Sequence, residues 1–528
     1  MSFDTLIKNG EIIDGTGRLR YEADVGIDAG RIAAVGHLAG AEAARTVDAA
    51  GLIVAPGFID MHSHSDVSLF DDPGGESKAH QGVTTEVTGN CSYSPFPIGV
   101  NATPGSRLGW KYTWGHWTDL DGWANQLESN GISINVAPQL GQSALQEAVG
   151  AIEERPATED EMRSMKRLAS EAMEQGAFAM STGLNLAPSG YMSTDEIVAL
   201  CRGIRHYDGA FYTTHARVGA GKQISMIEEA IEIGRRAEIP VQFSHMAITD
   251  RRFYGRGPEM LELLEDAQKD GVDIAFDMYP YTAAQAGLDQ VVPVWVQTGG
   301  IDRYLERLQD PEIRAKVREE VAIGIGGLAP LWDTWVVADV QTEGNKAIVG
   351  HSIAEIAAER GVEPAEVVLQ LEEEERGVLS GVVHNRVEGD IRYFLSHPLG
   401  MIGSDGNAIS PTGVSSNEQL HPRFYGTYPR ILGRYVREQS LLSLETAVYK
   451  MSGFPAERLG LRDRGRVREG MVADLAIFDP HTVVDRATFE DPHQLSDGVR
   501  HVVVNGEFII SNGKHTGARA GAVLRRGS

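Results

Sequence analysis

The sequence contains very little cysteine: Cys91 and Cys201 are the only two among 528 residues. A secreted scaffold stapled by disulfides uses more, so that class is excluded and each thiol is free to pack or to bind a metal. The sequence also lacks a long apolar run, and its first residues, MSFDTLIKNGEIIDG, have neither a basic start nor a stretch of membrane-spanning length. We therefore expect a cytoplasmic protein that does not bind a membrane.

Positive charge is scarce, because 48 Lys and Arg stand against 74 Asp and Glu, for a formal net charge of -26. Such a chain repels a phosphate backbone, and no Lys/Arg-rich run offsets this locally, so we expect no nucleic-acid partner. With 42% hydrophobic and 23% charged residues, the composition is that of a globular protein. A small molecule is the expected partner, and a homo-oligomer is left open.

Both ends of the chain read as short strands separated by turns. The strand-like segments of the N-terminal part lie between residues 6 and 54, and those of the C-terminal part between residues 473 and 510, around the hairpin signal Asn505-Gly506. Neither set is large enough to close a core alone. We therefore expect residues 1–58 and 464–528 to pair into one small β-sandwich domain.

Between these ends, strand-like runs alternate with helical periods. The run of alternating segments comprises 132–137, 159–175, 177–181, 193–207, 211–215, 224–237 and 241–244. This alternation indicates a parallel sheet, and residues 59–463 hold enough units for a (β/α)8 TIM barrel. A doubly wound open sheet is the alternative. The acidic helical segments within about 288–395 interrupt the spacing, so we expect an insertion over the barrel mouth there.

Four histidines lie where predicted barrel strands end. His62 and His64 form a His-x-His pair, and alternate residues of a strand point to the same side. His215 and His245 each end a further strand. An isolated histidine at such a place is more often structural, but the carboxyl ends of three barrel strands meet around one mouth. Since imidazole nitrogen suits zinc, the pattern predicts a zinc site.

Two further strand ends carry reactive groups. Cys91 closes the β-branched run 82–91, where it is either a buried apolar thiol or a thiolate that bridges two metals. We favour the ligand, and we expect Cys201, within a helical period, to pack. Asp405 ends an apolar strand late in the barrel. Ser-Asp-Gly alone is a common turn, but beside a metal this carboxylate is suited to proton transfer.

These residues resemble the N-acyl-D-amino-acid deacylases of the amidohydrolase superfamily. The resemblance covers nearly the whole length and rests on the segments APGFIDMHSHSD (55–66), QGVTTEVTGNCSYSPFPIG (81–99), STGLNLAPSGY (181–191), THAR (214–217), QFSH (242–245), FDMYPYTA (276–283), MIGSDG (401–406), HPRFYGTYPRILGRYVRE (421–438) and KMSGFPAERLGLRDRGRVREGMVADLAIFD (450–479). It implies a tight zinc at Cys91, His215 and His245, and a weaker second site at His62 and His64 that shares the thiolate. It further implies that Asp405 is the catalytic acid/base and that Tyr281 and Arg423 hold the substrate carboxylate.

The sequence departs from that family at the substrate. Ala247 stands where the family usually has a lysine facing the carboxylate, Gln285-Ala286 replaces a pair of small hydroxyl residues, Gln142 replaces a histidine, and the loop 407–420 is longer. We therefore expect weak or narrow activity on ordinary N-acetyl-D-amino acids, and a preference for a larger or less acidic amide whose polar end meets Arg423, Gln285 or this loop. Two roles are equally favoured for the rings of Trp110, Trp114 and Trp117. They either form a pocket for the acyl chain or pack beneath a loop.

The expected activity is hydrolysis of an N-acyl-D-amino acid, or a related N-acyl compound, to a carboxylate and a free amine. Two alternatives remain. The first is hydrolysis of a cyclic amide or of an N-acyl amine without a carboxylate. The second is a catalytically silent relative that only binds, which the retention of every predicted ligand and of Asp405 argues against.

Overall fold

The computed structural model describes residues 2–99, 117–217 and 223–527. At its centre, the described residues form a closed barrel of parallel strands, which are β6 (Phe58–Asp60), β7 (Val83–Thr88), β8 (Asn135–Pro138) continued by β9 (Leu140–Gly141), β10 (Ala179–Gly183), β11 (Phe211–His215), β12 (Val241–Phe243), β13 (Ile274–Met278) and β17 (Gly400–Ile402). The ring closes between β17 and β6, where the Met61 amide donates to the Ile402 carbonyl at 3.2 Å. The predicted barrel is therefore confirmed, and the open doubly wound sheet is wrong.

Helices cover the outside of the barrel. They include α3 (Leu120–Asn130), α5 (Glu159–Glu174), α6 (Thr194–Ile204), α7 (Ser225–Ala237), α8 (Gly257–Lys269), α13 (Glu388–Ser396), α15 (Leu444–Met451) and α16 (Gly453–Leu459). Helix α5 begins at a capping box in which Thr158 and Glu161 satisfy each other's backbone amides, and it buries Met165, Ala169 and Met173 on one face. Within the described residues, no helix has both the length and the apolar character that a membrane crossing requires.

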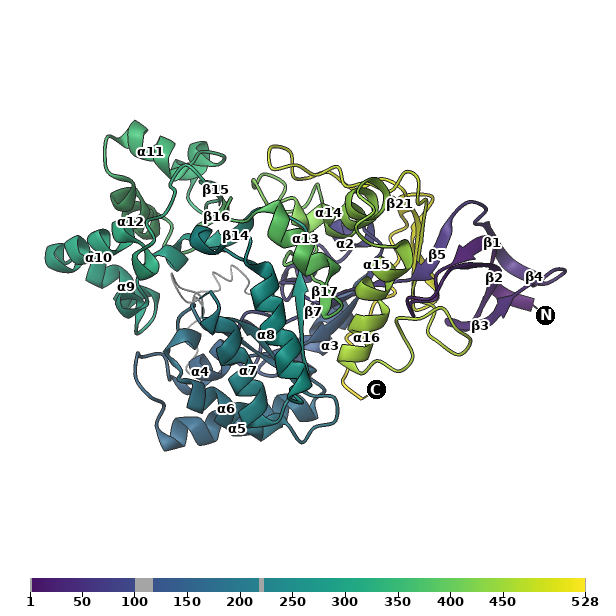
Figure 1. Ribbon diagram of the computed structural model, residues 1–528, viewed down its shortest axis with the longest axis horizontal. Helices are drawn as coiled ribbons and strands as arrows, with labels where there is room; N and C mark the ends of the chain where they lie inside the picture. Colours follow the sequence, from purple (N-terminus) through teal and green to yellow (C-terminus); the bar gives the residue numbers. More distant parts are fainter. Residues whose placement is uncertain (1, 100–116, 218–222, 528) are drawn as a thin grey trace.

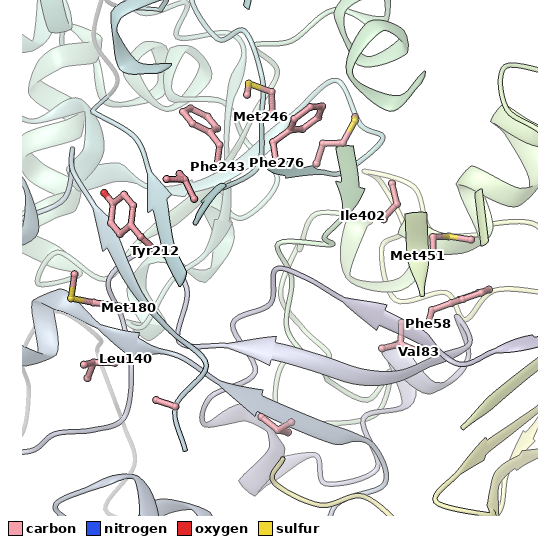
Figure 2. Close-up of a cluster of buried hydrophobic side chains, with 14 of the residues drawn as sticks. Phe58, Val83, Leu140, Met180, Tyr212, Phe243, Met246, Phe276, Ile402 and Met451 are labelled. Carbon is pink, nitrogen blue, oxygen red and sulfur yellow. The ribbon is translucent and has the colours of Figure 1, made fainter. Parts of the chain in front are cut away.

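Alternation along each strand separates two apolar layers. Figure 2 shows the outer layer, which the strands direct toward the helices and which includes Phe58, Met180, Tyr212, Phe276 and Ile402. Their sequence neighbours form a separate cluster inside the barrel, comprising Ile59, Ala179, Phe211, Ala275 and Met401. Residues Ala456 and Leu459 of α16, together with Leu524, belong to that inner cluster and close the barrel opposite the metal-facing mouth. The interior is thus a packed core, and only the mouth is open to substrate.

The two chain ends share one sheet at the right of Figure 1, as predicted. Its strands are β1 (Ser2–Ile12), β2 (Tyr21–Asp28), β3 (Arg31–Gly36), β4 (Glu42–Asp48), β5 (Ile53–Pro56), β18 (Leu475–Phe478), β19 (Val499–Val504), β20 (Glu507–Ser511) and β21 (Lys514–His515). Strand β1 pairs first with β4 and then, beyond a bulge, with β5, so the sheet bends over a shared apolar core as a sandwich. The last residues leave this sheet, since the Leu524 amide donates to the Val136 carbonyl at 2.7 Å. The terminal segment therefore binds the barrel.

A separate unit with its own core lies at the opposite end of the molecule (Figure 1). It contains the antiparallel strands β14 (Ala284–Gly287), β15 (Trp335–Asp339) and β16 (Ser380–Val383) and the helices α9 (Ile301–Leu308), α10 (Pro311–Ile323), α11 (Ile353–Arg360) and α12 (Pro364–Glu374). Its apolar cluster extends from Leu288 to Val383 and is distinct from the barrel clusters. We call this unit, residues 284–383, the insertion, and we infer that it is the segment predicted within 288–395.

A fully buried lysine lies at the seam of the barrel. Lys78, from the short helix α2 (Glu76–Ala79), places its Nζ 2.7 Å from Asp60 Oδ2, 3.2 Å from Glu86 Oε1 and 3.1 Å from the Gly406 carbonyl oxygen. These three partners belong to β6, β7 and the turn after β17. Burial raises the pKa of Glu86 to about 7, although Lys78 opposes that rise. One cation thus joins the barrel's first two strands to its last.

We predict that Lys78→Met lowers the free energy of unfolding by about 3–5 kcal/mol, because it leaves a carboxylate buried without its cation. The unfolding midpoint in urea is the measurement. Lys269→Met is the matched control, since that ammonium is 70% exposed and pairs with Asp266 on a helix surface, where an ion pair contributes little. Equal midpoints for the two variants would contradict the prediction.

Candidate metal centre and active site

The predicted ligands come together at the carboxyl ends of the barrel strands. His62 follows β6, Cys91 follows β7, His215 is the last residue of β11 and His245 follows β12. The Cys91 sulfur lies 3.3 Å from His62 Nε2 and 3.4 Å from His245 Nε2. Side chains from four strands therefore meet around one thiol.

Two groups of potential ligands share this thiol. One consists of His62, His64 and Cys91, the other of Cys91, His215 and His245, and the ligand atoms within each group lie within 4.8 Å of one another. Nitrogen and sulfur at this spacing fit zinc, which Cys and His hold in most protein sites. His215 supports this fit independently, because its Nε2 is buried and has no hydrogen-bond partner among the described residues. The geometry supports the sequence-based assignment of Cys91 as a ligand common to two positions.

The electrostatics of the site favour a thiolate. Burial raises the pKa of the Cys91 thiol, but His62 and His245 outweigh burial and hold the pKa well below its ordinary value. Only the thiolate binds a metal strongly. Cys201, by contrast, is buried in helix α6, and burial raises the pKa of its thiol, as expected of a packing residue.

Three of the predicted site residues have left-handed backbone conformations: φ is 53° at Cys91, 36° at His245 and 55° at Asp405. Each costs on the order of 1–3 kcal/mol for a residue with a side chain and persists only where neighbours enforce it. Hydrogen bonds enforce two of them. The His245 amide donates to Asp277 Oδ1 at 2.8 Å, and the Asp405 amide donates to the His62 carbonyl at 2.7 Å.

Asp277 is a site residue to which the sequence analysis assigned no task, although it lies inside a quoted segment. Its Oδ1 is 3.2 Å from His62 Nδ1, and its Oδ2 accepts from Gln242 Nε2 at 3.0 Å. A carboxylate on the far nitrogen of a ligating imidazole fixes the ring and raises its basicity. The position of Asp277 within an apolar strand could have indicated a role, because acidic residues are almost never buried without a partner.

Asp405 faces the same point from the last strand. Its Oδ1 lies 3.0 Å from His64 Nε2, and its Oδ2 lies 2.9 Å from Arg423 Nη1. Burial raises the pKa of Asp405, but Arg423 and His64 outweigh it, so the pKa lies well below its ordinary value. The carboxylate is therefore ionised and able to accept a proton.

The site opens into a cavity of about 560 Å³ between the barrel mouth and the insertion. Among the residues predicted to bind substrate, Gln285 and Arg423 line it, and so does Ala247. Tyr281 does not line it, because this side chain packs against His421 and Arg430, whereas Tyr279 lines the cavity. The geometry thus favours Tyr279 over Tyr281 as the tyrosine next to a substrate.

Of the three tryptophans considered for an acyl-chain pocket, Trp117 lies among the described residues. Trp117 stacks on Phe70, and its Nε1 donates to the Pro95 carbonyl at 2.7 Å, so this ring packs in the core. Trp110 and Trp114 lie outside the described residues.

The amidohydrolase family model matches residues 45–510. The chain is 36% identical over 530 residues to a D-aminoacylase of Alcaligenes xylosoxydans xylosoxydans, covering 99% of this chain and 98% of that one. It is 35% identical over 528 residues to an N-acyl-D-aspartate deacylase of the same organism, covering 99% and 95% of the two chains. The chain belongs to the amidohydrolase family.

A relative of known structure binds zinc. The N-acyl-D-glutamate deacylase from Bordetella bronchiseptica, complexed with zinc and a phosphonate inhibitor that mimics the tetrahedral intermediate, matches this amidohydrolase with a TM-score of 0.84 at 30% identity, covering 99% of this chain and 100% of the relative. The fold, including the sandwich formed by both termini, is therefore that of the D-aminoacylase branch of the amidohydrolases.

We predict that the purified amidohydrolase contains zinc and that Cys91→Ala or His215→Ala removes both metal and activity, since a site with few protein ligands cannot lose one without a large fall in affinity. Metal content by mass spectrometry, beside turnover, is the measurement. Cys201→Ala is the control and should retain the metal. Full occupancy in the Cys91 and His215 variants would refute the assignment.

Proposed function

We propose that this amidohydrolase is a zinc-dependent deacylase that hydrolyses the amide of an N-acyl-D-amino acid, or a related N-acyl compound, to a carboxylate and a free amine. The observation that carries the proposal is the Asp405 carboxylate, 3.0 Å from His64 Nε2, beside a cysteine shared by two pairs of histidines. The names of the D-aminoacylase and N-acyl-D-aspartate deacylase relatives support the substrate class.

Zinc, when bound by Cys91 with His215 and His245, supplies Lewis acidity that favours attack of water on an amide carbonyl. The protein's own groups then handle the proton. Asp405 accepts it from the attacking water and donates it to the departing nitrogen. Arg423 keeps Asp405 ionised in the resting site and fixes its orientation through the contact at 2.9 Å.

Asp405→Asn is expected to retain zinc and the fold but to lose at least about 100-fold in kcat, because an amide cannot accept the proton. Turnover of the best substrate gives the rate, and zinc content with the unfolding midpoint shows that the site is otherwise intact. A wild-type rate in this variant would mean that another group transfers the proton.

The activity itself is tested with a panel of amides at equal zinc occupancy. We expect kcat/KM to be higher for N-acetyl-D-methionine than for its L enantiomer and for a cyclic amide such as dihydrouracil. Turnover of the cyclic amide alone would replace the deacylase proposal by the cyclic-amide alternative. The absence of all turnover in the zinc-loaded protein would favour a relative that only binds.

A further inference from the structure

Arg386 is a cation of the cavity that the sequence analysis did not single out. It lies between β16 and α13, just beyond the insertion, and its side chain lines the cavity. Its backbone amide donates to the Thr282 carbonyl at 3.1 Å, which ties it to the segment that leaves β13. The return from the insertion thus places a guanidinium at the barrel mouth.

Two arginines contact one tyrosine there. The Arg386 Cζ lies 4.4 Å from the centroid of the Tyr279 ring, and the Arg423 Cζ lies 4.6 Å from the same centroid. Such cation–π contacts orient a guanidinium while leaving its N–H edge available to a ligand. Arg423 in turn contacts Asp405, so the sequence of contacts Asp405–Arg423–Tyr279–Arg386 leads from the proton-transfer residue into the cavity.

The two arginines differ in how their charge is balanced. Arg423 pairs with Asp405, whereas Arg386 forms no ion pair with any residue that the structure describes. Its Nε is buried and has no hydrogen-bond partner among the described residues. A polar donor removed from water without a partner is costly, so an anion is the ligand that this position favours.

We propose that Arg386 binds a carboxylate carried by the amine part of the substrate and is a specificity-determining residue of this amidohydrolase. The inference rests on the proposed function and deepens it. We place this carboxylate on the amine part of the substrate for the following reason. Asp405 donates a proton to the departing nitrogen, and the contacts that start at Asp405 lead to Arg386. Ala247, in the same cavity, supplies no charge, and the arginines that line it among the described residues are Arg386 and Arg423. Weak activity on N-acetyl-D-amino acids was expected with Arg423 as the cation that meets the substrate. Arg386 is a second cation in the same cavity.

The test compares kcat/KM for three substrates in wild type and Arg386→Gln. N-Acetyl-D-methionine carries an α-carboxylate, N-acetyl-D-glutamate carries a second one on its side chain, and N-acetyl-D-methioninamide carries none. We expect a loss of about 10- to 100-fold for a carboxylated substrate, the size of a charged hydrogen bond, and a change below about threefold for the neutral amide. A loss with both acids identifies the α-carboxylate, and a loss with the glutamate alone identifies the side-chain carboxylate.

Matched variants separate this effect from damage to the insertion. Arg360→Gln removes an arginine that pairs with Glu374 on the insertion and does not line the cavity, so its kcat/KM values should match wild type. Arg386→Lys keeps the charge without the planar fork and should lie between wild type and Arg386→Gln. Equal losses on all three substrates, or no loss on any, would overturn the proposal.

A binding measurement distinguishes failure of this inference from failure of the proposed function. Calorimetric binding of D-glutamate, the amine product of N-acetyl-D-glutamate and a carrier of both carboxylates, needs no turnover. We expect zinc-loaded wild type to bind it about 10-fold or more tightly than Arg386→Gln does. Equal affinity, or no binding by wild type, overturns the assignment of Arg386 even if hydrolysis is observed.

Discussion

The buried ammonium of Lys78 is the interaction on which the geometry of the active site depends. The barrel must close between strands that are far apart in sequence, and the metal ligands sit on both sides of that closure. Lys78 contacts Asp60 at the end of β6, Glu86 within β7 and the carbonyl of Gly406 beyond β17. Asp60 also accepts from the Ser404 amide at 2.7 Å, so the same ion cluster holds the turn that carries Asp405. The buried ion cluster below the site thus helps to fix the distance between the Asp405 carboxylate and the histidines.

The backbone at the mouth is strained where three of the barrel strands end. A strand that ran on regularly would direct alternate side chains toward the helices, whereas a left-handed residue just beyond the strand breaks this alternation. Cys91, His245 and Asp405 all adopt this conformation. The barrel strands themselves are held by their parallel ladder and contain no left-handed residue, so the strain lies at the rim while the barrel below stays regular.

The sequence predicted the fold well because local patterns control it. The strand predicted at 211–215 coincides with β11, and the helix predicted at 159–175 ends one residue from α5. The metal ligands could be predicted for the same reason, since strand ends converge in a barrel. Tyr281 shows the limit. A shift of two residues, from Tyr281 to Tyr279, decides whether a ring faces Arg430 or the cavity, and the irregular segment after β13 has no period that reveals it.

The sequence indicated an interruption of the barrel pattern within about 288–395, but it assigned no task to that segment, because the contribution of the insertion is long-range. Arg386 meets Tyr279 only after the chain has folded the three strands β14, β15 and β16 into a sheet and returned to the barrel. The loop 407–420 is tied to the same sheet, since the Gln419 amide donates to the Ala338 carbonyl at 2.8 Å, and Asn407 at its start lines the cavity. Chemistry and specificity therefore have separate structural origins here. Strand ends of the barrel position Asp405 and the predicted zinc ligands, whereas the insertion and the loop that docks on it border the rest of the cavity.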